Sequence, residues 1–447
     1  MQVHAFVDEG LGHSSYLIDL GNGTAAVIDP PRFPEDHEAL ARKLGLDIVW
    51  TIDTHSHADY VTGSPGLVVR RTATFVAPEA SRLATPHRPV ADGDCIALAP
   101  GITMLAIATP GHTPDHCAYL LEVDGRPEVL FSGGSLMVGT VGRTDLAGKE
   151  TAEPLAHEMF RSLRRFDGLD DALEVLPTHG AGSFCSAPGA SERTTTMGRE
   201  RATNPLFAIT DEASFVATLL AGFGAIPAQF GRLPELNRRG PRRFDTVPTL
   251  ADLSPAAVES AVAIGAVIVD IRRIAKFAAG HVAGSLSNQL RPVFGTWLGW
   301  LVDPGQPIVF VADDDQDIAD AVRQCLDVGH EQFAGRLAGG VGAWKASGRT
   351  LASISLVGAA DLRSGIVDVR QSDEFARGHV LAAMNVELAA TRDEQLPMRP
   401  MTVMCGHGER AMTGASVLAA RGYDVDVLLG GPDDWASAAG QPLVAGP

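Results

Sequence analysis

One cysteine lies in a loop whose neighbours could activate a thiol. The apolar segment 401–404 leads directly into Cys405-Gly406-His407-Gly408-Glu409-Arg410, and a helix-like run of small residues follows. Glycines let consecutive backbone N–H groups turn toward one anion, and a helix start adds its positive dipole end. Together with a cation, these groups favour thiolate over thiol. We therefore expect a nucleophile at Cys405 rather than an inert buried cysteine, with Arg410 as its catalytic cation and with Gly406, His407, Gly408 and Glu409 as the substrate-binding loop.

A second group of reactive side chains lies in the first half of the chain. His55, His57 and Asp59 follow an apolar segment that ends at Thr54, and His112 and His179 each follow a further apolar segment. Imidazole and carboxylate groups that converge from strand ends can bind a transition metal. The pattern predicts a metal site with His55, His57, Asp59, His112 and His179. Cys185, shortly after the last histidine, is either a sulfur relay or a plain structural thiol.

The elements around the histidines are those of a mixed α/β domain. Short β-branched segments at 25–28, 48–52 and 74–76 alternate with helical stretches up to about residue 200. Residues 232–246 are rich in Arg, Pro and Gly, which predicts a linker. The first domain is therefore expected to span 1–241.

The remainder of the chain contains an internal repeat. The segment that starts at Ile268 aligns with the one that starts at Ile366, and GGVGAW aligns with GGPDDW. Each copy is about 100 residues of alternating strands and helices, which predicts two small doubly wound α/β domains at 246–350 and 355–447. In the aligned segments the following residues correspond: Asp270 and Asp368, Phe277 and Phe375, Gly280 and Gly378, His281 and His379.

The first copy lacks the thiol of the second. Its strand-like segment 307–311 leads into a loop without cysteine, and four carboxylates between Asp313 and Asp317 would repel an anionic donor. We expect this copy to serve as a scaffold and an interface. Cys325 is expected in its core, and Cys95 and Cys117 in the core of the first domain.

Composition excludes several classes of protein. The 447 residues suit about three domains, and 45% hydrophobic with 20% charged residues is unlike a disordered chain. The net charge of -18 disfavours binding to nucleic acid or to anionic membranes. Five scattered cysteines, no signal-like N-terminus and no apolar run long enough to span a membrane predict a cytoplasmic protein.

The C-terminal motifs resemble those of a known family. CGHGERA is similar to the active-site loop of rhodanese sulfurtransferases, and IVDVR, GHV and GGPDDW resemble other parts of the same domain. This resemblance covers 355–447. It implies that Cys405 accepts a sulfane sulfur as a persulfide and passes it to a thiophile, and that the first copy is a rhodanese domain without its nucleophile.

The N-terminal motifs resemble the metallo-β-lactamase fold, an αββα sandwich. THSHADYVTGS, TPGHTPDH and VGRTDLAG are closest to its persulfide dioxygenase branch. That branch implies oxidation of a thiol persulfide by O2 to sulfite and thiol, at an Fe(II) held by His55, His112 and an aspartate. Gly134 stands where the aspartate belongs, and Tyr60 stands where relatives carry a second-metal histidine.

The missing carboxylate leaves three possibilities for the metal site. Asp59 or Asp115 substitutes as ligand, His55, His57 and His112 bind zinc or iron, or no metal binds. The expected function is sulfurtransfer through Cys405 coupled to a dioxygenase-type domain. The alternatives are a zinc-dependent thioester hydrolase of glyoxalase II type and a non-catalytic persulfide-binding sulfur carrier. The expected small-molecule partners are a low-molecular-weight thiol persulfide, thiosulfate or sulfite, and the resemblance implies a homo-oligomer.

Overall fold

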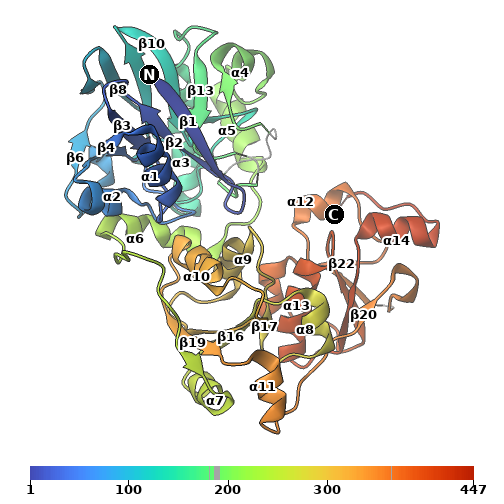
Figure 1. The fold of residues 1–447 in the computed structure, drawn as a ribbon. Coiled ribbons are helices and arrows are strands. Elements are labelled where there is room, and N and C mark those ends of the chain that lie inside the picture. The colour runs from blue at the N-terminus through green and yellow to red at the C-terminus, as the bar shows by residue number, and fades with distance from the viewer. Residues whose placement is uncertain (181, 186–191, 364, 447) are drawn as a thin grey trace. The chain divides into compact units, whose positions relative to one another are not determined.

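The computed structural model describes every residue except 181, 186–191, 364 and 447 (Figure 1). The chain divides into two compact units, one of Met1–Thr246 with Leu326–Gly329 and one of Val247–Cys325 with His330–Pro447. The sequence-based domain limits of 1–241, 246–350 and 355–447 stay predictions. Residue 447, the end of the third range, lies outside the described part of the chain.

The first unit contains two six-stranded sheets packed face to face. Their strand orders are β1-β2-β3-β4-β5-β6 and β14-β13-β10-β9-β8-β7. Alternate residues of each strand point to the shared core, where Tyr16 lies 5.3 Å from Phe131 between ring centroids. The strands of the first sheet are β1 (Gln2–Asp8), β2 (His13–Asp19), β3 (Thr24–Ile28), β4 (Asp47–Ile52), β5 (Thr74–Pro78) and β6 (Arg88–Val90). Those of the second are β7 (Cys95–Ala99), β8 (Ile102–Ala108), β9 (Cys117–Val123), β10 (Arg126–Gly133), β13 (Glu174–Pro177) and β14 (Thr195–Thr196), and a small β11 (Leu136–Met137) and β12 (Thr140–Val141) pair stands apart.

Helices cover the outer faces of both sheets, which completes an αββα sandwich (Figure 1). Ala41 and Leu67 pack on the first sheet, and Met159 and Phe215 pack on the second. The predicted fold is therefore confirmed. The helices are α1 (Glu35–Leu44), α2 (Ser64–Arg71), α3 (Lys149–Arg164), α4 (Met197–Thr203), α5 (Glu212–Ala221) and α6 (Leu233–Arg239), with 3-10 turns at Glu79–Ser81 and Ala228–Gly231.

Two expectations about this unit are wrong. The segment 232–246 is not a plain linker, because α6 occupies its first half and buries Asn237. The Asn237 amide donates to the backbone oxygens of His57 and Tyr60, so the helix supports the loop that carries His57. Cys95 is exposed rather than in the core, because the alternation of β7 turns it outward. Cys117 is buried as expected.

The second unit contains two parallel five-stranded sheets of the same topology. The orders β15-β19-β18-β16-β17 and β20-β24-β23-β21-β22 correspond strand for strand. The first sheet has β15 (Asp252–Leu253), β16 (Val267–Asp270), β17 (Leu286–Ser287), β18 (Ile308–Val311) and β19 (Phe333–Leu337), with α7 (Pro255–Ala263), α8 (Ile274–Ala279), α9 (Phe294–Leu301), α10 (Ile318–Asp327) and α11 (Gly340–Ala346). The second has β20 (Leu356–Val357), β21 (Gly365–Asp368), β22 (Met384–Asn385), β23 (Met401–Met404) and β24 (Val425–Leu428), with α12 (Ser372–Arg377), α13 (Glu409–Ala420), α14 (Pro432–Ala439) and 3-10 turns at Ala359–Asp361 and Leu388–Arg392.

The residues aligned in the sequence repeat have the same structural roles in both copies. Asp270 forms a buried ion pair with Arg272, as Asp368 does with Arg370. Each GH histidine stacks on the phenylalanine four residues earlier, with centroids 3.9 Å apart in the first copy and 3.7 Å in the second. The conserved strand order and these pairs confirm two doubly wound copies of one fold.

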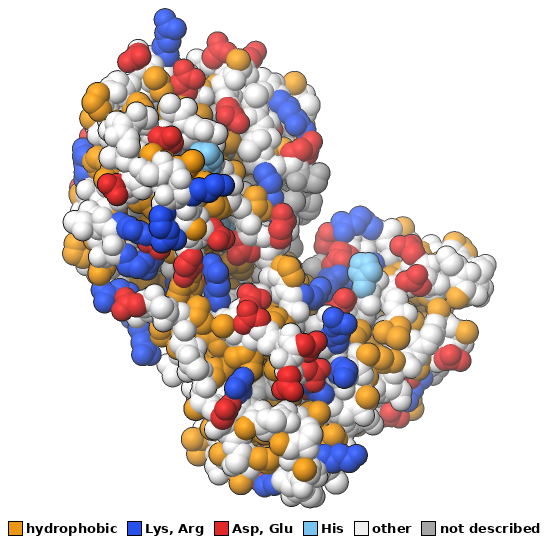
Figure 2. Space-filling view, in the orientation of Figure 1, with side chains coloured by type: hydrophobic (Ala, Val, Ile, Leu, Met, Phe, Trp, Pro, Cys, Tyr) orange, Lys and Arg blue, Asp and Glu red, His pale blue; other side chains and the backbone are white. Residues whose placement is uncertain are grey.

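Two surface properties accompany the fold. On the face drawn in Figure 2, acidic and basic side chains are interspersed over both units. Among the described residues, no helix combines the length and the apolar character needed to cross a membrane.

Candidate functional sites

The predicted metal-binding histidines come together at one edge of the sandwich. His55 follows β4, His112 follows β8 and His179 follows β13, so all three come after the carboxyl ends of strands. All are buried, and the rings of His55 and His112 lie 5.0 Å apart between centroids. Burial lowers the pKa of His55 and of His112 well below the ordinary value, which leaves both rings neutral.

His57 is held by a partner that sequence reasoning missed. Its Nε2 lies 3.1 Å from Asp29 Oδ1 and 3.0 Å from the hydroxyl of Tyr60. Burial alone would lower the pKa of His57, but the Asp29 carboxylate outweighs it and raises the pKa. Asp29 also accepts from the backbone and hydroxyl of Thr54 and from the hydroxyl of Thr178, so it ties two of the site loops together. Its position directly after β3 was the signal that could have indicated it.

The third ligand position does not suit a two-histidine, one-carboxylate iron centre. Gly134 supplies no carboxylate, and a Cβ placed on it would lie 2.2 Å from Cδ2 of His112. Its backbone N–H donates instead to Nε2 of His116, a buried histidine that the sequence did not single out. The facial arrangement that oxygen-activating Fe(II) uses is therefore incomplete here.

The two proposed substitute carboxylates differ in position. Asp115 accepts hydrogen bonds from the backbone and hydroxyl of Ser56, and it lines a neighbouring cavity of about 720 Å³. Asp59 is buried, with Oδ2 3.3 Å from Nδ1 of His179. Burial would raise the pKa of Asp59, but His179 lowers it, which keeps the carboxylate charged. Only Asp59 of these two contacts a metal-site histidine in the described residues.

Cys185 is buried in the same place. Its ligand atom and those of His112 and His179 all lie within 4.8 Å of one another, and His55, His57 and His179 form a second such group. Burial raises the pKa of the Cys185 thiol well above its ordinary value. The structure thus places the predicted metal residues in two overlapping groups that share His179, with Cys185 in one of them and Asp59 next to His179.

The Cys405 loop has the geometry of an anion cradle. The loop joins β23 to the twelve-residue helix α13, and the Gly408 N–H donates to Cys405 Sγ at 3.1 Å. Gly408 has φ +110°, a backbone conformation that favours glycine. Cys405 is 1% exposed and His407 is exposed. The helix start and the N–H together direct positive potential at the sulfur.

Arg410, at the start of α13, is paired with a carboxylate. Its guanidinium donates to both carboxylate oxygens of Glu374 on α12, at 2.6 and 2.8 Å. Burial would raise the pKa of Glu374, but this pairing holds it below the ordinary value. Arg410 also lies 5.6 Å from the ring centroid of Trp297, which belongs to the first copy of the repeat.

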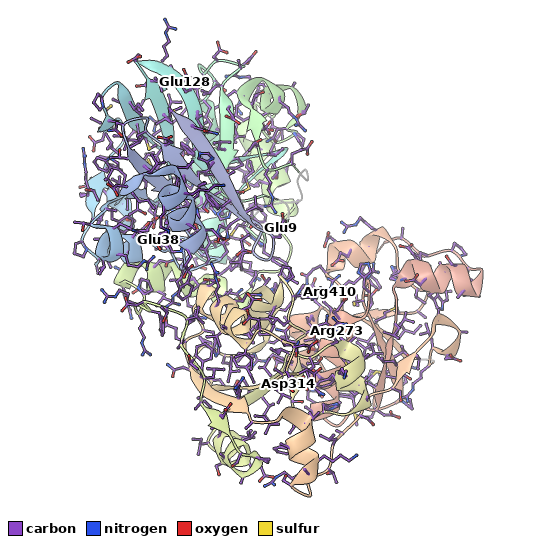
Figure 3. All side chains as sticks on the ribbon, in the orientation of Figure 1. Glu9, Glu38, Glu128, Arg273, Asp314 and Arg410 are labelled. Atoms are coloured by element: carbon purple, nitrogen blue, oxygen red, sulfur yellow. The ribbon has the colours of Figure 1, made fainter. Side chains whose placement is uncertain are left out.

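The first copy contributes further groups near Cys405. A Cβ on Gly408 would lie 3.3 Å from Ile274 on α8, where α13 and α8 adjoin (Figure 3, with Arg410 and Arg273 labelled). Arg291 precedes α9, and its charge interacts with those of Cys405 and Glu409. Among the described residues its side chain forms no ion pair. Burial lowers the pKa of Arg291 from its ordinary value, and the two acidic neighbours partly offset this.

The corresponding loop of the first copy carries no nucleophile. It runs from β18 to α10 and includes Asp314 (Figure 3). Gln316 braces it by donating to the backbone oxygen of Ile271. Cys325 lies farther along, buried in α10, and its place in the core is confirmed.

Comparison with known proteins agrees with both halves. The rhodanese-like domain family matches residues 254–347 and 355–438. The persulfide dioxygenase ETHE1 of Homo sapiens is 31% identical over 185 residues, which are 40% of this chain and 68% of that protein. A hydroxyacylglutathione hydrolase of Rhizobium meliloti is 31% identical over 215 residues, 42% of this chain and 79% of that enzyme. The chain belongs to the metallo-β-lactamase superfamily.

This metallo-β-lactamase–rhodanese fusion also resembles a solved structure along most of its length. A metallo-β-lactamase from Staphylococcus aureus is 27% identical with a TM-score of 0.68, and the match covers 75% of this chain and 98% of that one. Because 75% exceeds the share of the sandwich alone, the match extends into the second unit. The fusion of the two folds supports a role in sulfur metabolism.

Proposed function

We propose that the fusion protein is a sulfurtransferase that carries sulfane sulfur as a persulfide on Cys405. The observation that carries this proposal is the Cys405 loop itself, in which a backbone N–H at 3.1 Å and the start of α13 face one buried sulfur. Such groups stabilise an anion on sulfur in both the free enzyme and the persulfide.

The transfer consists of two displacements. The Cys405 thiolate attacks the outer sulfur of thiosulfate, a new S–S bond forms, and sulfite leaves with the electron pair of the old bond. A thiophile then attacks the outer sulfur of the persulfide, and the Cys405 thiolate leaves. The Gly408 N–H donates to the free Cys405 sulfur. Because each displacement starts with an anionic sulfur nucleophile and releases an anion, neither step needs a proton from the protein.

Binding of the anionic donor falls to Arg291 more than to Arg410. Glu374 neutralises Arg410 through two hydrogen bonds, whereas Arg291 forms no ion pair among the described residues. The first rhodanese-like copy thereby supplies a cation as well as a scaffold. This assignment extends the sequence-based hypothesis, which placed the anion on Arg410.

Thiosulfate-to-cyanide transfer tests the proposal. We expect Cys405→Ser to abolish thiocyanate formation, while Cys95→Ser, which alters an exposed cysteine, leaves it unchanged. Full activity in Cys405→Ser would show that the nucleophile lies elsewhere.

Persulfide oxidation by the sandwich domain is a second candidate, favoured by the identity with the human persulfide dioxygenase. Its test is oxygen uptake and sulfite formation by the Fe(II)-loaded Cys405→Ser variant after addition of a thiol persulfide. Iron-dependent uptake would support this candidate and would require a ligand other than a carboxylate at Gly134, and no uptake would rule it out. Thioester hydrolysis of glyoxalase II type has less support, because Tyr60 and Gly134 replace two side chains that a dinuclear centre needs. Cytoplasmic location and a homo-oligomer stay predictions.

A further inference from the structure

The three strand-end histidines of the sandwich are oriented as metal ligands are. In two of the rings Nδ1 has a hydrogen-bond partner: Nδ1 of His55 lies 2.8 Å from Thr54 Oγ1, and Nδ1 of His112 lies 2.9 Å from the backbone oxygen of Arg143. Nδ1 of His179 lies 3.3 Å from the Asp59 carboxylate, within ion-pair distance but without hydrogen-bond geometry. Metal-bound histidines anchor their second nitrogen in this way on hydroxyl, carbonyl or carboxylate oxygens. In each ring Nε2 is left to face the centre.

Two of these nitrogens have the separation of ligands on one ion. Nε2 of His55 lies 3.3 Å from Nε2 of His179. Two bonds of about 2.0–2.1 Å at a tetrahedral angle place their nitrogens about 3.3–3.4 Å apart. Nε2 of His112 is buried without a hydrogen-bond partner among the described residues, which a bound cation would correct.

Cys185 is the sulfur donor beside these rings. Its ligand atom lies within 4.8 Å of those of His112 and His179, and the residue is fully buried. The backbone N–H of Arg143 donates to the Cys185 oxygen at 3.0 Å, while the Arg143 oxygen faces Nδ1 of His112. One residue therefore fixes the cysteine and the histidine together.

The absence of a carboxylate at position 134 and the presence of Cys185 nearby are linked. The His112 ring occupies the space that a side chain at position 134 needs, because a Cβ there would lie 2.2 Å from the ring. An oxygen ligand from that position is thus excluded, and the nearby thiol is the available replacement. A set of imidazoles and one thiolate matches zinc-class metals and differs from the set typical of oxygen-activating iron.

We propose that Cys185 replaces the lost carboxylate and that His112, His179 and Cys185 hold a zinc-class divalent ion, with His55 as the further imidazole next to His179. Binding forms a metal–sulfur bond and releases the thiol proton to solvent. The site is independent of sulfurtransfer through Cys405, and Asp59 acts behind His179 as a positioning residue.

Cobalt substitution of the full-length protein tests this assignment. The parent is Cys405→Ala, which removes the proposed sulfurtransfer thiol. The readouts are cobalt content and the near-ultraviolet sulfur-to-cobalt absorption band. We expect one cobalt per chain with this band. Adding Cys185→Ala should abolish the band and weaken binding at least tenfold, whereas adding Cys117→Ala, a buried cysteine outside the cluster, should preserve both. A band that survives Cys185→Ala, or a parent that binds no cobalt, would overturn the proposal.

X-ray absorption of the zinc-loaded parent provides a test that needs no new variant. A sulfur neighbour at about 2.3 Å is expected beside nitrogen at about 2.0–2.1 Å. A first shell of nitrogen and oxygen only would refute Cys185 as a ligand, even if the Cys185→Ala variant fails to fold.

Discussion

Arg291→Gln removes a cation that interacts with the Cys405 loop and has no ion-pair partner in the described part of the chain. Two unit charges 4 Å apart attract by about 4 kcal/mol at an effective dielectric of about 20. Arg291 is half-buried, so solvent screens part of this, and a charged hydrogen bond typically contributes about 1.5–3 kcal/mol. We therefore expect kcat/KM for thiosulfate to fall about 10- to 150-fold, mostly through KM.

Steady-state thiosulfate–cyanide kinetics measure this effect. Arg336→Gln is the matched control, because it makes the same charge change at an exposed arginine on β19 that pairs with Asp252. The loss in Arg291→Gln should shrink at high salt, which screens exposed charges. A kcat/KM within twofold of the wild type, or an equal loss in Arg336→Gln, would refute the assignment of anion binding to Arg291.

Three further predictions concern other groups. Glu374→Gln should lower KM for thiosulfate about threefold, equivalent to about 0.7 kcal/mol, because it releases the charge of Arg410, and an unchanged KM would contradict this. Gly134→Ala should cost about 1–3 kcal/mol of unfolding free energy in urea denaturation, because its Cβ meets His112 at 2.2 Å, whereas Gly168→Ala, which meets nothing within 4 Å, should not. Burial lowers the pKa of His37 to about 3. Above the unfolded-state pKa of about 6.5, His37 is neutral in both states and the full unfolding free energy is present. As pH falls from there toward 3, only the unfolded state binds the proton, so the unfolding free energy decreases by at most about 1.4 kcal/mol per pH unit. Urea denaturation between pH 7 and 4 should show a shallower loss in His37→Gln, and equal slopes would count against it.

The fold was largely predictable because its determinants are local and repeated. The strand-end positions of His55, His112 and His179 follow from apolar segments that end just before them, one in the first sheet of the sandwich and two in the second. The repeat showed two copies of one fold, since Asp270 and Asp368 occupy the same place in both. The alternation of exposed and buried residues in β7 could also have predicted that Cys95 is exposed. The apolar character of the segment favoured the wrong prediction of a core position.

The partners of the site residues could not be predicted, because they come from distant parts of the chain. Asp29 approaches His57, and Glu374 approaches Arg410, through packing that spacing does not encode. Arg291 interacts with the charges of Cys405 and Glu409 although it belongs to the other copy of the repeat, and spacing along the chain does not encode this. The role of α6 was hidden because its Arg and Pro content is also typical of a linker.

Sulfur loading of Cys405 tests the central claim most directly. The full-length protein is incubated with thiosulfate, freed of small molecules and examined by mass spectrometry, intact and after digestion without reductant. We predict a gain of one sulfur atom on the peptide that contains Cys405, its removal by cyanide as thiocyanate, and no gain in Cys405→Ser. A sulfur atom on Cys185 with Cys405 unmodified would contradict the account.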